Sequence, residues 1–252
     1  MPMFNSYSDT LLLVFLYVNF WFILAQILKD NSIMDIAWGL GFVCISWWIH
    51  MFYTSNISGL LMTIVTIWGF RLGLYIFLRA RKKGEDWRYV QMRKHWGQQQ
   101  MIKAYFRVFL LQGFFMYIIA LPLIENDTPT HLGILQIIGL ILWLIGFLWE
   151  SIADWQLFAF KKDAKNKGKL MTTGLWGYSR HPNYFGEIVL WWGIYICILP
   201  NSLWWLTIIS PITITWLLTK ISGVPMLEKK YKNNVEYQAY IKSTNSLIPK
   251  FK

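Results

Sequence analysis

Long apolar runs separated by short polar segments dominate this chain. Seven of the runs suit a bilayer core of about 30 Å, which takes about 20 helical residues to cross. They cover residues 10–28, 33–53, 57–79, 106–124, 132–160, 184–199 and 202–221. The sixth run is short, so we expect its helix to begin in the polar segment before it. The pattern predicts an all-α fold, an integral membrane bundle of seven helices that forms one domain over residues 1–252.

Basic residues fall on one side of this predicted bundle. With seven spans, the loops after the first, third, fifth and seventh share a side, and they carry Lys29, the blocks 79–107 and 161–180, and the tail 229–252. The other segments, which include the turn at 54–56 and the loop at 125–131, contain no lysine or arginine. Because basic loops face the cytoplasm, we expect the N-terminus outside and the C-terminus in the cytoplasm.

Composition supports a membrane protein and narrows its partners. The 252 residues are 56% hydrophobic and 15% charged, whereas soluble chains are about 45–50% apolar and about 25% charged. Topology and anionic lipids account for the net charge of +11, so membrane lipids are expected partners and nucleic acid is not. Cys44 and Cys197 lie in apolar runs without the spacing of a metal site, so no metal is expected.

The densest group of polar side chains lies just before the sixth run. Residues 174–187 read Gly-Leu-Trp-Gly-Tyr-Ser-Arg-His-Pro-Asn-Tyr-Phe-Gly-Glu, and we call this stretch the motif. Pro182 suits the first turn of a helix, which would place Asn183 and Glu187 at i and i+4 on one face. A carboxylate carried into a hydrophobic helix usually has a function or a partner. The alternative is a loop at the lipid headgroups, with Asn183 as an ordinary helix cap.

Few charged side chains lie within the apolar runs themselves. Asp35, Arg71, Glu150 and Asp154 do, and such residues mark functional sites by default. Glu150 and Asp154 are spaced i, i+4, so they repel each other on one helical face and need donors such as ribose hydroxyls, an amide or a cation. Lys161 follows about two turns later.

Together these groups predict a polar pocket in the cytoplasmic half of the bundle. Its acids would accept hydrogen bonds from hydroxyls, its cations would hold phosphate, and its aromatic side chains would stack on a planar ring. This set fits a nucleotide cofactor, although the chain has no glycine-rich dinucleotide fingerprint. A transported ion, a lipid headgroup and a purely structural network of these residues are the alternatives.

Two further cytoplasmic segments mix charges with aromatic residues. Residues 79–96 suit a helix lying on the headgroups, with a solvated basic loop as the alternative. The tail at 236–249 is too aromatic for a disordered end, so we expect it to pack back on the cytoplasmic face.

The motif resembles the C-terminal signature of the steroid 5-alpha-reductase family, most closely its bacterial branch. The similarity extends over residues 32–39, 68–73 and 150–156 and over the terminal Leu-Ile-Pro. The resemblance implies seven helices around a cavity, a reductase-like part at about 131–252, and residence in a bacterial inner membrane. It also implies NADPH held on the cytoplasmic side and reduction of a carbon–carbon double bond conjugated to a ketone, in a hydrophobic substrate from the bilayer.

The resemblance and the predicted pocket together give two sets of candidate residues. The cofactor-binding candidates are Glu150, Asp154, Lys161, Tyr178, Arg180, His181, Asn183, Tyr184 and Glu187. Within that set, the resemblance places the pair of acids at the adenosine or ribose part and the lysine near phosphate. The catalytic candidates are Asp35, Tyr75 and Trp68.

The catalytic candidates include one departure from the family pattern. Asp35 lies about where the family has a glutamate that helps to polarise the substrate carbonyl, and a buried acid could donate a hydrogen bond to the developing enolate. The family's catalytic tyrosine falls on Trp68, whose indole N–H donates a hydrogen bond but does not readily supply a proton. Either Tyr75 or Asp35 supplies the acid, or the chain does not carry out this reaction.

A second enzyme class shares part of the motif. Arg180-His-Pro-Asn-Tyr184 also resembles the Arg-His-Pro-x-Tyr element of isoprenylcysteine carboxyl methyltransferases, which are membrane enzymes that use S-adenosylmethionine. Their later Glu and Tyr-x-x-Tyr element has counterparts in Glu228 and in Tyr237 with Tyr240. The Asn183–Glu187 segment favours the reductase. A bundle that binds lipid without catalysis is the third interpretation, and Trp68 is its main support.

Overall fold

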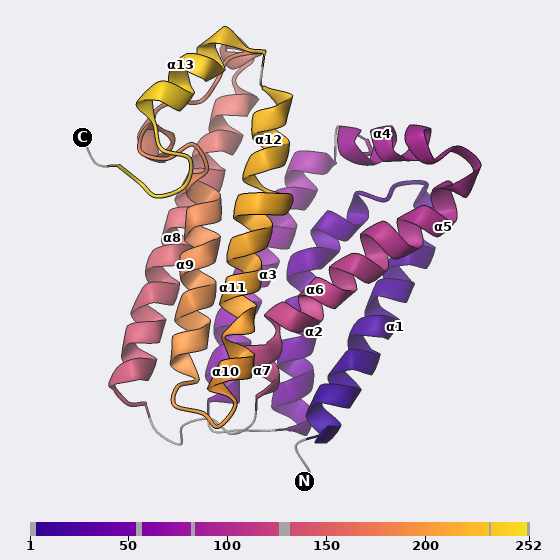
Figure 1. Ribbon diagram of the computed structural model, residues 1–252, viewed down its shortest axis with the longest axis vertical. Coiled ribbons are helices and arrows are strands. Elements are labelled where there is room, and N and C mark those ends of the chain that lie inside the picture. The colour runs from indigo at the N-terminus through magenta and orange to yellow at the C-terminus, as the bar shows by residue number, and fades with distance from the viewer. Residues whose placement is uncertain (1–3, 54–56, 82–83, 126–131, 232, 251–252) are drawn as a thin grey trace. The chain divides into compact units, whose positions relative to one another are not determined.

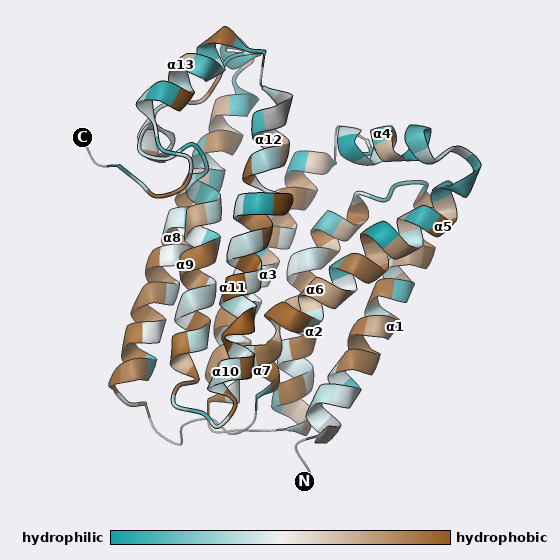
Figure 2. Cartoon of the chain, in the orientation of Figure 1, coloured by the Kyte–Doolittle hydropathy of each residue, from teal (hydrophilic) through white to brown (hydrophobic). Residues whose placement is uncertain are grey.

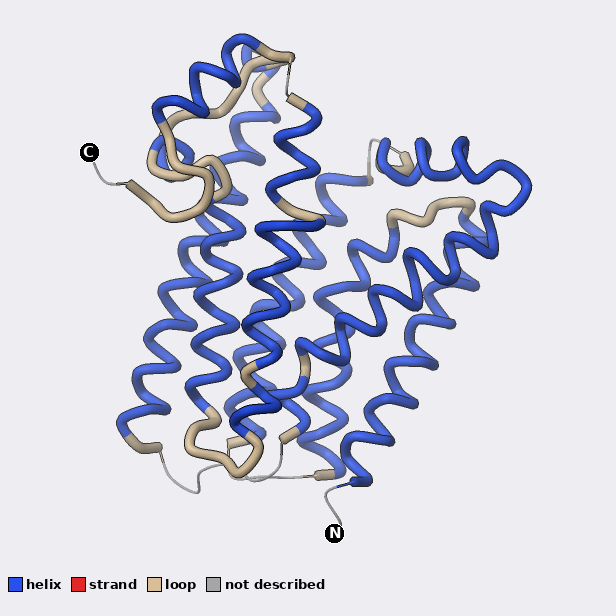
Figure 3. The backbone as a smooth tube through the Cα atoms, viewed as in Figure 1, coloured by secondary structure: helices blue, strands red, loops and turns tan. Residues whose placement is uncertain are grey.

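The fold is helical throughout the part of the chain that the structure describes. The computed structural model describes residues 4–53, 57–81, 84–125, 132–231 and 233–250 (Figure 1). Within these ranges the backbone forms helices joined by turns and loops, and it forms no strand (Figure 3). The predicted turn at 54–56 and most of the predicted loop at 125–131 lie outside the described residues. The all-α prediction is confirmed.

Among the described residues, six helices are long and apolar enough to cross a membrane. They are Ser6–Leu28, Ile33–Phe52, Ser58–Ala80, Trp87–Ile119, Ile134–Lys162 and Trp204–Met226. The predicted span at 184–199 corresponds to a shorter helix of 16 residues, which begins at Pro182 inside the motif as expected. An integral membrane protein is therefore supported, while the count of seven spans and the orientation of the termini stay predictions.

The described residues form two compact units. The first unit comprises Met1–His131 and Pro200–Ile209, and the second comprises Leu132–Leu199 and Ser210–Lys252. The single-domain organisation stays a prediction beside this division. The first unit contains α1 (Phe4–Leu28), α2 (Ile33–Phe52), α3 (Ser58–Ala80), α4 (Trp87–Trp96), η1 (Gly97–Gln99), α5 (Gln100–Ala104), the π-helical η2 (Tyr105–Leu110), α6 (Leu111–Ile119), α7 (Leu121–Ile124) and α10 (Trp204–Thr207).

A close glycine contact joins α2 and α3 in the first unit. A Cβ atom added to Gly69 would lie 2.5 Å from the carbonyl oxygen of Gly39, so the two backbones touch there. Nearer the start of α2 the spacing relaxes, because a Cβ on Gly73 would lie 3.5 Å from the Ile36 oxygen, an ordinary contact. The helices therefore cross at one point and separate toward Asp35.

Hydrophilic residues of the first unit gather on α4 (Figure 2). This helix begins at Trp87, where the side chain of Asp86 accepts a hydrogen bond from the Arg88 amide at 3.0 Å and caps the helix. The predicted interfacial helix at 79–96 is thus divided, because its first residues finish α3.

The second unit is built on the helix pair α8 and α9. It contains α8 (Ile134–Lys162), η3 (Ala164–Asn166), η4 (Gly174–Gly177), α9 (Pro182–Cys197), α11 (Ile209–Trp216, except its first residue), the π-helical η5 (Leu217–Ile221), α12 (Val224–Lys230) and α13 (Val235–Ser243). The tail after α13 packs back on the motif through backbone hydrogen bonds. These bonds confirm that the tail packs back on the rest of the chain, while its cytoplasmic location stays a prediction.

Candidate functional site

Two pairs of glycines position the acids of α8 against the motif. A Cβ on Gly193 would lie 2.6 Å from the Gly139 oxygen, and a Cβ on Gly186 would lie 2.6 Å from the Gly146 oxygen. Each helix thus places glycines seven residues apart at the contact, and α8 and α9 run antiparallel with their backbones touching at both levels. Small residues that permit such close approach are typical of helix contacts in membranes.

The predicted acids lie directly beyond the second glycine contact. A Cβ on Gly186 would lie 2.8 Å from the Cβ of Glu150, which places Glu150 at the level of the motif. One turn further along α8, Asp154 Oδ1 accepts a hydrogen bond from Asn183 Nδ2 at 3.3 Å. The side chains of Glu150, Asp154 and Glu187 are 2%, 3% and 8% exposed. The structure therefore places the three buried acids and the half-buried Asn183 along the contact of α8 and α9, and we call this group the buried strip.

The first half of the motif is attached to α8. Gly174 has a φ of +61°, a backbone conformation that glycine adopts without strain. The turn it makes lets the Leu175 amide donate to Gln156 Oε1 at 3.0 Å. Trp176 Nε1 donates to the Ala153 oxygen, also at 3.0 Å. Gln156 and Ala153 therefore fix the start of the motif on the helix that carries the acids.

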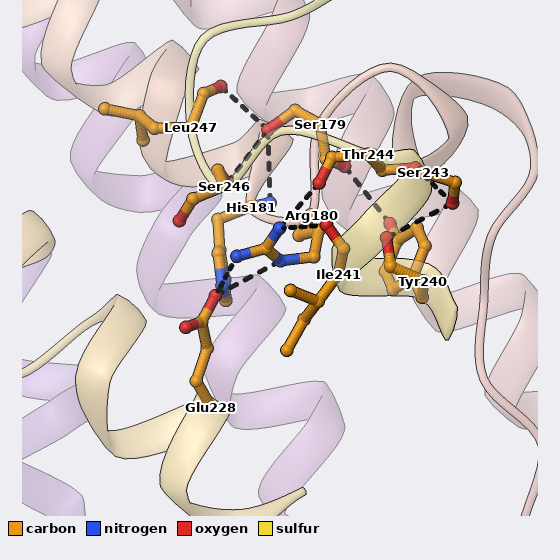
Figure 4. A network of polar contacts seen from close by, with 10 residues as sticks. All are labelled: Ser179, Arg180, His181, Glu228, Tyr240, Ile241, Ser243, Thr244, Ser246 and Leu247. Atoms are coloured by element: carbon orange, nitrogen blue, oxygen red, sulfur yellow. Dashed lines mark hydrogen bonds and ion pairs between the residues drawn. The ribbon is translucent and has the colours of Figure 1, made fainter. Parts of the chain in front are cut away.

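Arg180 occupies the centre of a polar network with α12 and the C-terminal segment (Figure 4). Its Nε and Nη2 atoms donate to Glu228 Oε1 at 3.1 and 2.5 Å. Its Nη1 atom donates to the Thr244 oxygen at 2.5 Å. The side chain is 8% exposed. The guanidinium predicted to hold phosphate is thus engaged by a carboxylate and a backbone carbonyl of the chain itself.

His181 is buried between this network and Tyr184. Its side chain is 3% exposed, and its ring stacks on that of Tyr184 with centroids 5.5 Å apart. Its Nε2 atom lies 3.6 Å from Glu228 Oε1, and neither ring nitrogen has a hydrogen-bond partner among the described residues. Burial lowers the pKa of His181 from 6.5 to about 4; Arg180 adds to the decrease and Glu228 opposes it. The imidazole is therefore neutral at pH 7.

The remaining cofactor candidates lie nearer the surface. Tyr178 is 37% exposed, and its carbonyl oxygen accepts from the Lys250 amide at 3.0 Å. Lys161 is exposed in the last turn of α8. Both belong to the same unit as the buried strip.

Asp35 is held by two residues of α4 in the first unit. Arg88 Nη2 lies 2.5 Å from Asp35 Oδ2, and the Tyr89 hydroxyl donates to Asp35 Oδ1 at 2.6 Å. Gln112 Nε2 in turn donates to the Tyr89 hydroxyl at 3.5 Å. Asp35 therefore acts as an acceptor in this arrangement, whereas its predicted role requires a donor. The sequence pattern did not indicate Arg88 and Tyr89 as partners of Asp35, although both belong to the aromatic and basic stretch at 79–96.

Trp68 and Tyr75 lie two turns apart on α3. Trp68 is fully buried and meets the ring of Phe42 edge to face, with centroids 5.7 Å apart. Tyr75 is half-buried, and the Arg79 guanidinium carbon lies 5.5 Å from the centre of its ring. Trp68 is thus packed against Phe42, and Tyr75 lies near the end of α3 toward Asp35.

Comparison with known proteins identifies a family for this chain. A family model described as a protein of unknown function, DUF1295, matches residues 21–244. The matched range includes the motif, the acids of α8, the Asp35 cluster and all of α13. Searches of the curated proteins and of the solved structures found no match.

Proposed function

The chain belongs to the DUF1295 family, a steroid 5-alpha-reductase-like family of membrane proteins, and from this premise we propose that it is an NADPH-dependent reductase. The substrate would be a hydrophobic molecule from the bilayer, sterol-like or lipid-like, with a carbon–carbon double bond conjugated to a ketone. The reaction would transfer hydride from NADPH to the β-carbon and a proton to the α-carbon, leaving NADP⁺ and a saturated ketone.

The buried strip along α8 and α9 is the observation that carries this proposal. Glu150, Asp154 and Glu187 are three carboxyl groups buried within a helix pair of otherwise apolar character. Buried acids of this kind are costly and mark ligand sites. Their oxygens can accept hydrogen bonds from ribose hydroxyls, and the Asn183 amide, one turn before Glu187, offers both a donor and an acceptor.

The charges of the second unit suggest how phosphate would be held. Arg180 already donates to Glu228 and to the Thr244 oxygen. Lys161, which is exposed at the end of α8, is therefore our candidate for the 2′-phosphate of NADPH. We retain Asp35 and Tyr75 as candidates for assisting at the ketone. Trp68 can contribute packing and one hydrogen-bond donor.

Cofactor-dependent thermal stabilisation of the detergent-purified protein tests this function. NADPH at 100 times its dissociation constant should stabilise the folded state by about 2.7 kcal/mol and raise the melting temperature, whereas NADH and S-adenosylmethionine should not. Asn183→Ala and Glu187→Ala should lose the NADPH shift while melting cooperatively. Glu236→Ala, which removes an exposed acid on α13, is the matched control and should keep it. Unchanged NADPH affinity in both motif variants would remove the motif from the cofactor site.

A methyltransferase of the isoprenylcysteine carboxyl type is the second candidate. The contact of Arg180 and His181 with Glu228 favours it, because these residues match separate parts of that family's pattern. Tyr240 adds a third part, since its hydroxyl donates to the Trp176 oxygen within the motif. A shift with S-adenosylmethionine alone would select this function. The absence of any cofactor shift would favour a lipid-binding protein without catalysis.

A further inference from the structure

The C-terminal segment 244–250 completes the motif from outside it. The Arg180 amide donates to the Asn245 oxygen at 2.9 Å, and the His181 amide donates to the Ser246 oxygen at 3.1 Å. Ser179 Oγ donates to the Leu247 oxygen at 2.7 Å (Figure 4). With the bond from the Lys250 amide to Tyr178, four consecutive motif residues are joined to this segment.

These bonds act on the part of the motif that precedes α9. His181 is the residue before the first turn of that helix, and its side chain makes no capping bond. The backbone direction at the start of α9 is therefore fixed by the partners of Arg180 and His181. Asn183 and Glu187 follow directly on that first turn, so their positions depend on the same bonds.

One ion pair attaches this arrangement to α12. Glu228 Oε1 accepts two hydrogen bonds from Arg180, while Arg180 Nη1 donates to Thr244 at the start of the segment. The Arg180 side chain is 8% exposed and the Glu228 side chain 28% exposed. Hydrogen bonds between charged groups are about twice as strong as neutral ones. The carboxylate thus holds a side chain that links α12, the motif and the C-terminal segment.

We propose that Glu228 is a positioning residue for the cofactor site, acting through Arg180 and the segment 244–250 to hold the motif in its binding conformation. This inference rests on the proposed function, and it assigns Arg180 an indirect role in place of a phosphate contact. The ion pair fixes the guanidinium, the guanidinium fixes Thr244, and the segment then supplies the carbonyl oxygens that hold the Arg180 and His181 amides.

Hydrogen exchange combined with cofactor titration of the full chain tests the inference. Glu228→Gln keeps the size of the side chain and an oxygen acceptor but loses the charge. We expect exchange at 178–181 and 244–250 to accelerate about tenfold, the change that 1.4 kcal/mol produces, with no change over 139–154 in α8. NADPH affinity, measured by thermal shift, should fall by a similar factor.

Two further variants make the test specific. Glu228→Asp keeps the carboxylate, so it should recover most of the protection and of the NADPH affinity. Glu236→Gln removes an exposed carboxylate of α13 and should match the wild type in both measurements. A purely structural role would lower the melting temperature of Glu228→Gln without a selective change in NADPH affinity.

The possible contrary results distinguish the ion pair, the positioning role and the proposed function. Unchanged exchange in Glu228→Gln would show that the ion pair does not hold the segment. Faster exchange with wild-type NADPH affinity would overturn the positioning role and leave the proposed function standing. A wild-type protein that shows no NADPH shift would overturn the proposed function and the positioning role together, while the exchange comparison still decides whether Glu228 holds the segment.

Discussion

Two antiparallel helix pairs, α2 with α3 and α8 with α9, use glycine contacts in different ways. The first pair touches at Gly39 and Gly69 and loosens by Gly73, where the nearest oxygen to an added Cβ is 3.5 Å away. The second pair touches at two levels seven residues apart, with 2.5–2.7 Å from an added Cβ to the facing backbone at each. One contact sets a crossing point, whereas two contacts fix the register of the helices along their length.

This difference in helix contact determines which elements supply the partners of the acidic side chains in each pair. Asp35 lies where α2 and α3 separate, and α4 supplies its partners Arg88 and Tyr89. Glu150 and Asp154 lie beyond a contact that holds α9 tightly against α8, and Asn183 of the facing helix meets Asp154. Asp35 is held by residues of an additional helix, α4. Glu150 and Asp154 are positioned by the register of the α8 and α9 pair itself.

The largest loss of stability is expected from substituting a glycine at the contact of α8 and α9, the more closely packed pair. Gly186→Ala places a Cβ 2.5 Å from the Glu150 amide and 2.6 Å from the Gly146 oxygen, so we expect a loss of about 3 kcal/mol in stability from overpacking. Gly73→Ala, where space exists, should be neutral or slightly stabilising, because alanine is the better helix former. Melting temperatures in detergent compare the two variants. A neutral Gly186→Ala would refute the close contact.

Acidification should destabilise the second unit through His181. Burial keeps the folded histidine neutral down to a pKa of about 4, whereas the unfolded chain binds a proton below about 6.5. The unfolded state therefore binds more protons between these values, and the free energy of unfolding decreases as the pH falls, by about 3 kcal/mol. Melting temperature measured from pH 7 to 4 checks this dependence. His181→Gln should flatten the profile, because glutamine carries no titratable group.

Removing the ion pair of Asp35 should lower the stability of the protein without affecting the binding of NADPH. Asp35→Asn removes one of the two carboxylates that pair with Arg88 and leaves Asp86, and because the side chains are partly exposed we expect a loss of about 1 kcal/mol in stability. The thermal shift produced by NADPH should persist, since the proposed cofactor residues belong to the other unit. Loss of that shift in a variant that still melts cooperatively would contradict the division of roles.

The smallest effect is expected for the bond that joins α8 to α9 through side chains. Asn183→Ala removes a hydrogen bond of 3.3 Å to Asp154, which should lower stability by about 0.5 kcal/mol because the glycine contacts already fix the register. Melting temperature compared with Gly186→Ala measures this difference. A loss equal to that of Gly186→Ala would mean that the side chains, and not the glycines, hold the pair together.

Hydrophobic periodicity predicted the long helices and the start of α9 at Pro182. The polar groups within the apolar runs also predicted that the acids of α8 and the motif would share a polar region, and Asp154 does meet Asn183. The partners of Arg180 and Asp35 could not be predicted in this way, since Glu228 and Arg88 lie 48 and 53 residues away along the chain. Glycines spaced by seven at 139 and 146, and again at 186 and 193, were a readable signal of the close contact.

The short length of α9 has a consequence for how the protein fits its bilayer. Sixteen residues span about 24 Å, less than a hydrocarbon layer of about 30 Å, yet every residue of α9 is buried or half-buried. The Gln136 amide donates to the Cys197 and Leu199 oxygens at 3.1 and 2.5 Å and so satisfies carbonyls where the helix ends. A mismatch between helix length and bilayer thickness therefore acts on α8. Its 29 residues span about 43 Å and include exposed isoleucines and leucines. Thinner or thicker membranes would tilt or strain that outer helix, while α9, the helix that begins inside the motif, keeps its length independent of the lipid.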